Sequence, residues 1–227
     1  MRVAQFDVNS QIALSFSDFG YFTECNCSRE VGLCGWITVP YAVQGNLFDL
    51  LAVSYTRIQK SQKMALLKQI ALCHQTLKTN GIVHGDIKLE NYVQTPNGAL
   101  PIDFGLSIDL EDSSQRPQGY GTIGYMAPEV AARHVADYEK ADVFSYGVLM
   151  FHTLAVRQLI ASTNPVNYLR DIVESVNPTI VRPYLININV PAQMCDLILA
   201  CLSLNPKDRP TFTSIVDFYN ANLQLQA

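Results

Sequence analysis

The stretch HGDIKLEN at residues 84–91, followed by DFG at residues 103–105, is the part of the sequence that decides the fold. Pro96-Asn97-Gly98 lies between the two and is typical of a tight turn, and the short apolar runs on either side of it predict a β-hairpin. Because a hairpin brings its two ends together, we expect the polar side chains of both stretches to meet in one pocket. Those side chains belong to Asp86, Lys88, Asn91 and Asp103.

This set of side chains suits the transfer of a phosphoryl group. Carboxylate and amide oxygens are the ligands that Mg²⁺ prefers, and the ion usually brings substrate phosphates with it. Lysine supplies a point charge for a phosphate, and a carboxylate that does not bind the metal can orient a hydroxyl nucleophile. Taken singly, Asp86 and Asn91 are compatible with ordinary turn residues. Their combination with Asp103 is what favours chemistry.

The same stretches resemble the protein kinase family. HGDIKLEN is similar to that family's catalytic loop H-R-D-L-x-x-x-N, and the chain also carries the family's D-F-G and, at residues 127–129, its A-P-E. Further similar segments are the hinge with the helix after it (39–51), the start of the central buried helix (140–151) and the late arginine motif (201–212). The resemblance covers about residues 12–223. It implies an α+β, protein-kinase-like fold, with a mainly helical large lobe and a truncated β small lobe.

The resemblance also gives each polar residue an expected role. Asp86 is expected to orient the substrate hydroxyl, and Lys88 to contact the transferring phosphoryl group. Asn91 and Asp103 are expected to hold Mg²⁺ and, with it, ATP. Thr122, in GTIGYMAPE, is expected to form hydrogen bonds near Asp86 and Lys88 and to complete the catalytic set. Lys88 and Thr122 are marks of the serine/threonine type.

The hinge is expected to bind the adenine of ATP. By the same resemblance, Val39 matches the residue that borders the adenine pocket. Pro40 is expected to offer its carbonyl oxygen, and Ala42 its backbone N–H.

Other residues are expected to hold the structure of the site. Glu129 and Arg209 are expected to form a buried ion pair that anchors the activation segment, which runs from D-F-G at residue 103 to A-P-E at residue 129. Asp142 is expected to hold the backbone of the catalytic loop. His84 is expected to pack beneath Phe104.

The start of the chain departs from the family. Kinases cover ATP with a glycine-rich loop and hold its phosphates with a strand lysine, whereas the first lysine here is Lys60. We divide one kinase-like domain into a small-lobe remnant (1–38), a hinge (39–45) and a large lobe (46–227). We expect this chain alone to bind Mg-ATP weakly and to transfer phosphate little or not at all. We also expect the exposed small-lobe face, residues 12–22 and 36–39, to cause aggregation or to attract a partner.

Two features bear on the activation segment. GYGTIG at residues 119–124 matches the pattern G-x-G-x-x-G, but because it lies between D-F-G and A-P-E we interpret it as part of that segment. Gly85 stands where the family usually has an arginine that pairs with a phosphorylated loop, so we hypothesise that control by loop phosphorylation is reduced. Phosphorylation of Ser113, Ser114 or Tyr120 stays open.

Two functions follow from these observations. The first is a protein serine/threonine kinase that transfers the γ-phosphate of ATP to a protein hydroxyl. The alternative is an inactive kinase-like binding module, or a truncated kinase fragment that lacks the glycine loop and the phosphate-binding lysine. Intact Asp86, Lys88, Asn91 and Asp103 favour the first, and the missing small-lobe elements favour the second.

Composition and charge exclude several classes of protein. Of the 227 residues, 48% are hydrophobic and 16% charged, which rules out intrinsic disorder. The net charge of −4, without a basic run, argues against nucleic acid as a partner. The longest apolar stretch, 143–156, is too short and too interrupted to span a membrane.

The six cysteines bear on location and on metal binding. No secretory signal accompanies them, so we expect reduced thiols and a cytoplasmic location. Cys25, Cys27 and Cys34 cluster, but a spacer of one residue is not the usual zinc spacing, and we favour ordinary packing over zinc.

Periodicity predicts a little β structure at the front of the chain and mostly helix behind it. Residues 11–24 and 35–42 are typical of strands. Residues 46–52, with Asn46 as a cap, and 61–81, capped by Ser61 and ended by Asn80-Gly81, are typical of helices. Further helices are predicted over residues 127–132, 140–156, 165–176, 190–202 and 211–223.

Overall fold

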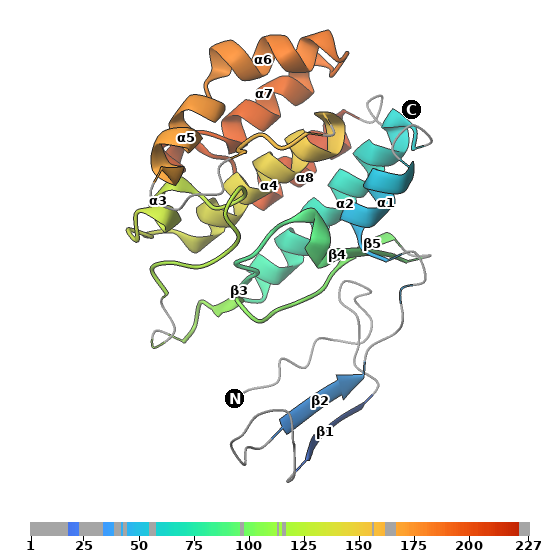
Figure 1. The fold of residues 1–227 in the computed structure, drawn as a ribbon, viewed down its shortest axis with the longest axis vertical. Helices are drawn as coiled ribbons and strands as arrows, with labels where there is room; N and C mark the ends of the chain where they lie inside the picture. The colour runs from blue at the N-terminus through green and yellow to red at the C-terminus, as the bar shows by residue number, and fades with distance from the viewer. Residues whose placement is uncertain are drawn as a thin grey trace.

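The computed structural model describes residues 18–22, 34–38, 42, 45–54, 58–95, 98–112, 114, 117–155, 157–161 and 167–222. In Figure 1 the helices gather into one large body, and short strands lie along its edge. None of the helices in the described ranges is long and apolar enough to cross a membrane.

The β structure consists of short antiparallel pairs. β1 (Asp18–Phe22) pairs with β2 (Cys34–Thr38), with Gly20 opposite Trp36. These two strands confirm that the predicted ranges 11–24 and 35–42 contain strands. β3 (Ile82–Val83) pairs with β6 (Ile108–Asp109) and so brings the chain after the D-F-G motif back to the start of the catalytic loop.

The predicted hairpin between the two polar stretches is confirmed. β4 (Tyr92–Thr95) pairs with β5 (Gly98–Pro101), and Tyr92 lies opposite Pro101. The 3₁₀ turn η1 (Leu89–Asn91) leads directly into β4. The backbone N–H of Ile102 donates to the carbonyl of Asn91 at 2.8 Å, so the two ends of the hairpin are joined.

The first two helices begin and end close to their predicted limits. α1 (Leu47–Ser54) is capped as expected, because Asn46 Oδ1 accepts a hydrogen bond from the backbone N–H of Asp49 at 2.9 Å. α2 (Lys60–Thr79) ends at Asn80, also as expected. The predicted cap at Ser61 is wrong, because the helix begins one residue earlier. Gln59 is the cap, and its N–H donates to the side chain of Gln62 at 2.8 Å.

The centre of the helical body is α4 (Tyr138–Ala155), which is buried on nearly all sides. This confirms that the apolar stretch after residue 140 is a core helix. Gly147 allows α7 (Ala192–Cys201) to approach closely, since a Cβ at Gly147 would lie 2.9 Å from Cβ of Cys201. Figure 1 shows α2 and α8 (Phe212–Ala221) beside α4, and α2 and α8 contact each other directly.

The remaining helices carry one correction. α3 (Pro128–Ala131), α5 (Tyr168–Ser175), α7 and α8 lie within predicted ranges, and η2 (Pro206–Asp208) precedes α8. α6 (Pro178–Asn187) was not predicted, because Pro178 and Pro183 suggested a break in helical structure. Pro178 instead occupies the first turn, where proline is well tolerated, and Asn177 caps the helix by accepting from the N–H of Thr179 at 3.0 Å.

Candidate active site

The backbone of the catalytic loop is held by a buried carboxylate from the central helix. Asp142 accepts hydrogen bonds from the backbone N–H groups of His84, at 2.9 Å, and Gly85, at 3.1 Å. Burial raises the pKa of Asp142 to about 7, and the two N–H donors oppose that shift. The expected role of Asp142 is confirmed: α4 fixes the point from which the loop projects.

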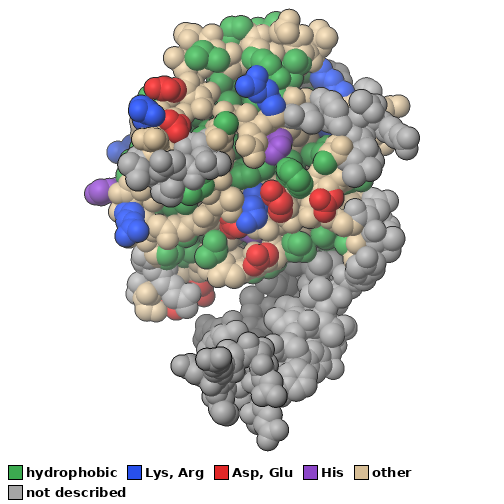
Figure 2. Space-filling view, viewed as in Figure 1, with side chains coloured by type: hydrophobic (Ala, Val, Ile, Leu, Met, Phe, Trp, Pro, Cys, Tyr) green, Lys and Arg blue, Asp and Glu red, His purple; other side chains and the backbone are tan. Residues whose placement is uncertain are grey.

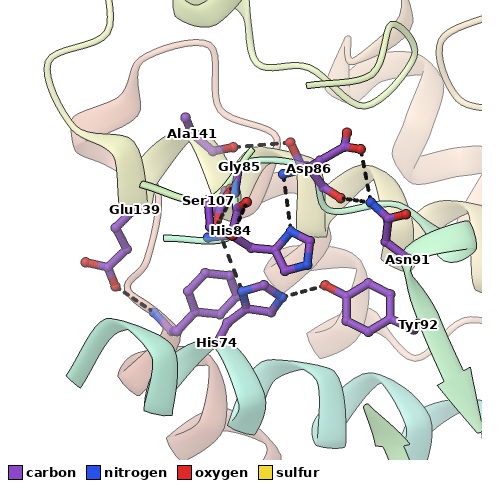
Figure 3. A network of polar contacts seen from close by, with 12 residues as sticks. His74, His84, Gly85, Asp86, Asn91, Tyr92, Ser107, Glu139 and Ala141 are labelled. Atoms are coloured by element: carbon purple, nitrogen blue, oxygen red, sulfur yellow. Dashed lines mark hydrogen bonds and ion pairs between the residues drawn. The ribbon is translucent and has the colours of Figure 1, made fainter. Parts of the chain in front are cut away.

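His84 is a structural residue. Its ring lies 5.1 Å from that of Phe104 between ring centres, as expected, and it is buried. Its Nε2 meets the carbonyl of Ile102 at 3.2 Å, and the backbone N–H of Asp86 donates to its Nδ1 at 3.3 Å (Figure 3). Burial lowers the pKa of His84, so the ring is neutral and its proton sits on Nε2.

The carboxylate of Asp86 lies at the centre of a polar cluster. It is 7% exposed. Lys88 Nζ donates to its Oδ2 at 2.6 Å, and the Thr122 hydroxyl donates to its Oδ1 at 2.7 Å. Lys88 Nζ also donates to the Thr122 hydroxyl oxygen at 2.8 Å. The structure therefore brings together Asp86, Lys88 and Thr122, as the sequence predicted, although Thr122 lies 36 residues from Asp86.

Asn91 contacts this cluster directly, and Asp103 follows Ile102, whose backbone N–H donates to the carbonyl of Asn91. The amide nitrogen of Asn91 donates to the backbone carbonyl of Asp86 at 2.8 Å and to its Oδ2 at 3.0 Å, as Figure 3 shows. The amide oxygen of Asn91 is therefore the atom left to meet a cation. The side chain of Asp103 is exposed, and its Oδ1 accepts from the N–H of Gly105 at 3.2 Å.

The donor set of this pair fits Mg²⁺. One amide oxygen and one carboxylate are hard ligands, and Mg²⁺ usually completes its six positions with water and substrate phosphates. Within the ranges that the structure describes, no group of three or more His, Cys, Asp or Glu side chains is placed to hold a metal.

The activation segment is anchored at its far end by the expected ion pair. Arg209 donates from Nη1 to Glu129 Oε1 at 2.5 Å and from Nη2 to Oε2 at 2.8 Å. The guanidinium also donates to the carbonyls of Lys140 and Ser203, and its side chain is fully buried. These contacts join α3 and the start of α4 to the segment that holds η2.

A second anchor was missed by sequence reasoning. Tyr168 in α5 donates its hydroxyl proton to the carbonyl of Met126 at 3.0 Å, and its oxygen accepts from the N–H of Gly124 at 3.0 Å. Ser145 in α4 donates to the carbonyl of Tyr125 at 2.8 Å. No local signal marks Tyr168, because it reaches the segment only through the packing of α5.

Gly85 has a backbone reason to be glycine. Its φ is +81°, and a Cβ placed there would lie 2.3 Å from the carbonyl oxygen of Leu106. That stretch is held against the loop, because Ser107 donates its hydroxyl proton to the carbonyl of His84 at 3.0 Å. The loop therefore leaves no room for the arginine that the family usually has here.

Other predicted residues divide into three groups. Several of them lie outside the described residues, as do most of residues 1–38; these are Val39, Pro40, Ser113, Cys25 and Cys27. Ala42 is described, and its carbonyl accepts from the N–H of Gly45 at 3.1 Å. Ser114 is exposed, whereas Tyr120 is buried and stacks on Tyr138 with ring centres 6.0 Å apart. Tyr120 is therefore closed to a modifying enzyme in this conformation.

Three of the cysteines are buried free thiols. Cys73, Cys195 and Cys201 are buried and form no disulfide. Figure 2 shows one face of the molecule, on which Lys or Arg and Asp or Glu side chains meet near the centre among hydrophobic ones.

A helical body with a catalytic loop held from its central helix, a D-F-G turn beside it and an activation segment anchored by an Arg–Glu pair defines a kinase-like domain. The chain belongs to the protein kinase domain family, whose model matches residues 32–218. This match confirms the resemblance on which the fold class was predicted.

The relatives and a solved structure agree with this membership. The chain is 30% identical to the Schizosaccharomyces pombe serine/threonine-protein kinase ppk11 over 84% of this chain and 60% of that protein. It is also 30% identical to serine/threonine-protein kinase shk1/pak1 of the same organism, over 78% of this chain and 26% of that protein. The crystal structure of the yeast RNA Pol II CTD kinase CTDK-1 complex has the same fold, with a TM-score of 0.78 at 16% identity, covering 95% of this chain and 77% of that one. The chain spans 60% or less of the length of these two curated relatives.

Proposed function

We propose that the chain is a protein serine/threonine kinase domain that transfers the γ-phosphate of ATP to a protein hydroxyl. The observation that carries the proposal is the Asp86 carboxylate, which is bonded to Lys88, to Thr122 and to the amide nitrogen of Asn91. Family membership and relatives named as serine/threonine kinases support it.

Each residue has a distinct task in this proposal. Bound Mg-ATP supplies the phosphoryl group and part of its counter-charge. Asp86 accepts the hydrogen bond of the substrate hydroxyl and so orients its oxygen for attack. Lys88 Nζ lies 2.6 Å from Oδ2 of that carboxylate. Its positive charge stabilises the negative charge that develops on the phosphoryl oxygens during transfer. Asn91 and Asp103 hold the metal through oxygen atoms.

Thr122 positions the reacting groups and links them to the activation segment. Its hydroxyl donates to Asp86 and accepts from Lys88, so it fixes the distance between the base and the cation. Phosphoryl transfer depends almost wholly on such positioning and on charge neutralisation. A threonine here couples the conformation of the segment to the geometry of the site.

The boundaries and surroundings of the domain are also proposals. We place the hinge at residues 39–45 and the large lobe at 46–227, with residues 1–38 as part of the small lobe. Val39, Pro40 and Ala42 are proposed adenine contacts. A cytoplasmic location fits the cysteine usage, and a protein that covers the small-lobe face is a proposed partner.

The test is a phosphate-transfer assay on the purified chain with Mg-ATP and matched peptides whose acceptor is serine, threonine or tyrosine. We expect weak labelling, confined to the serine and threonine peptides, and its loss in Lys88→Ala. Lys68→Ala is the matched control, because Lys68 lies on α2, outside the polar cluster. Labelling confined to tyrosine would contradict the serine/threonine assignment. Binding of Mg-ATP without transfer to any peptide would favour the inactive binding module.

A further inference from the structure

Arg133 occupies a backbone position that favours glycine. It follows α3 with a φ of +58°, while the N–H of the next residue, His134, donates back to the carbonyl of Glu129 at 2.8 Å. This is the left-handed position that closes many helices, where glycine is the usual residue because it has no Cβ. A long cationic side chain at such a position invites a functional explanation.

The side chain of Arg133 lies against the activation segment. A Cβ on Gly119 would be 3.4 Å from Arg133 Nε and 3.6 Å from its Cγ, so the absence of a side chain at Gly119 makes room for the arginine. Arg133 then lines a cavity of about 280 Å³ together with Ile123, Met126 and Tyr168. The cavity therefore has apolar walls and a cation at its edge.

The cavity adjoins the proposed catalytic cluster. Ile123 follows Thr122, whose hydroxyl donates to Asp86, and the N–H of Met126 donates to the carbonyl of Thr122 at 3.0 Å. Tyr168 fixes this wall through its hydrogen bonds to Gly124 and Met126. Gly121 and Ile123, on either side of Thr122, both line the cavity, so its wall is continuous with the residue that contacts Asp86.

The charge of Arg133 is available to a ligand. Across the described ranges, no ion pair involves Arg133. By contrast, Arg170 on neighbouring α5 pairs with Asp171 at 3.5 Å and Glu174 at 4.0 Å. The side chain of Arg133 is exposed, and a guanidinium binds carboxylate and phosphate groups through paired N–H donors.

We infer that Arg133 is a specificity-determining residue that binds an acidic side chain, carboxylate or phosphate, of the substrate peptide near its acceptor hydroxyl. The inference rests on the proposed function and names a class of substrate for it. The apolar walls of the cavity receive a neighbouring side chain of the same peptide, and the guanidinium pairs with the acid. The occupant is a segment of a substrate protein that carries an acidic residue beside an apolar one.

The test is peptide binding, which does not require catalysis. The full chain, treated with phosphatase, is titrated into fluorescent serine peptides that carry one apolar residue after the serine and one Glu moved stepwise through the following positions. Each Glu peptide has a Gln twin. We expect the preferred Glu peptide to bind about fivefold more tightly than its twin.

The variants are chosen so that folding does not confuse the result. Arg133→Gly places the residue that this backbone favours, so the variant is expected to fold while losing the Glu preference. Arg133→Lys keeps the charge and is expected to retain part of the preference. Arg170→Gln removes a cation that is already paired and is expected to leave the preference unchanged. Thermal melting of each variant checks the fold.

The inference is overturned by equal binding of the Glu and Gln peptides, or by a Glu preference that survives in Arg133→Gly. Phosphate transfer to serine without a Glu preference contradicts this inference and leaves the proposed function intact. If the Glu preference is lost in Arg133→Gly but the wild-type chain transfers no phosphate, the role of Arg133 in peptide binding is supported and the proposed catalytic function is contradicted.

Discussion

Arg209 donates hydrogen bonds of 2.5 and 2.8 Å to the two carboxylate oxygens of Glu129, which lies 80 residues earlier in the sequence. The guanidinium also lies over the ring of Phe144, 5.0 Å from its centre, so a residue of the central helix takes part in the same contact. This pair fixes the end of the activation segment to the helical body. It holds in place the segment whose Thr122 contacts Asp86.

We expect Glu129→Ala to destabilise the protein strongly. The substitution leaves the buried Arg209 charge without its partner, and breaking one side of such a pair costs about 3–5 kcal/mol. Urea unfolding measures the change. The matched control is Glu174→Ala, because Glu174 pairs with Arg170 at 4.0 Å on the exposed surface and its loss is expected to have little effect. Equal unfolding midpoints for the two variants would contradict the anchoring role.

We expect Asp86→Asn to abolish most phosphate transfer without unfolding the protein. Asparagine keeps the size of the side chain but cannot accept the hydroxyl proton, and the loss of a general base lowers rates by about 10²–10⁴-fold. The transfer rate and the melting temperature are measured on the same preparation. A variant that keeps its full rate would show that Asp86 has been given the wrong role.

The fold was predictable where the signal is local. The pairing of β4 with β5 and the helix α4 were predictable, because the signals of a hairpin and of a buried helix act over a few residues. α6 was missed because Pro183 lies inside it. Pro183 is exposed there, where water can bind the carbonyl that a proline leaves without a donor.

The site was predictable only in part. Asp86, Lys88 and Asn91 lie within one short loop, so their proximity follows from the sequence. The contact with Thr122 was expected from the family resemblance, not from spacing. Tyr168 and Arg133 carry no local signal at all, because their positions depend on how α5 and the end of α3 pack against the activation segment.

We expect Gly85→Ala to cost more stability than Gly45→Ala. Both glycines have a positive φ, +81° and +70°, so both substitutions incur the penalty of about 1–2 kcal/mol for a left-handed residue. At Gly85 the new Cβ also meets the carbonyl oxygen of Leu106 at 2.3 Å, whereas at Gly45 the nearest atom is 3.7 Å away. The extra overlap is expected to add about 1–3 kcal/mol. Chemical unfolding of both variants compares the two, and equal losses would show that the loop moves aside freely.

His74 is buried in α2. Its Nε2 lies 2.5 Å from the hydroxyl of Tyr92, as Figure 3 shows, and its Nδ1 lies 3.9 Å from Asp142. Burial lowers the pKa of His74 well below its ordinary value, so the folded protein keeps the ring neutral. As the pH falls below about 6.5, the unfolded chain binds a proton at this residue that the folded protein does not bind.

The wild-type protein therefore loses stability through His74 as the pH falls through that range, and His74→Phe does not. Phenylalanine retains the stacking on Phe212, where the ring centres are 4.9 Å apart, but it loses the hydrogen bond to Tyr92. We expect the free energy of unfolding of His74→Phe, relative to wild type, to rise as the pH is lowered from about 7 to 5. Unfolding curves at matched pH values measure it, and a difference that does not change with pH would show that His74 binds a proton equally well in the folded state.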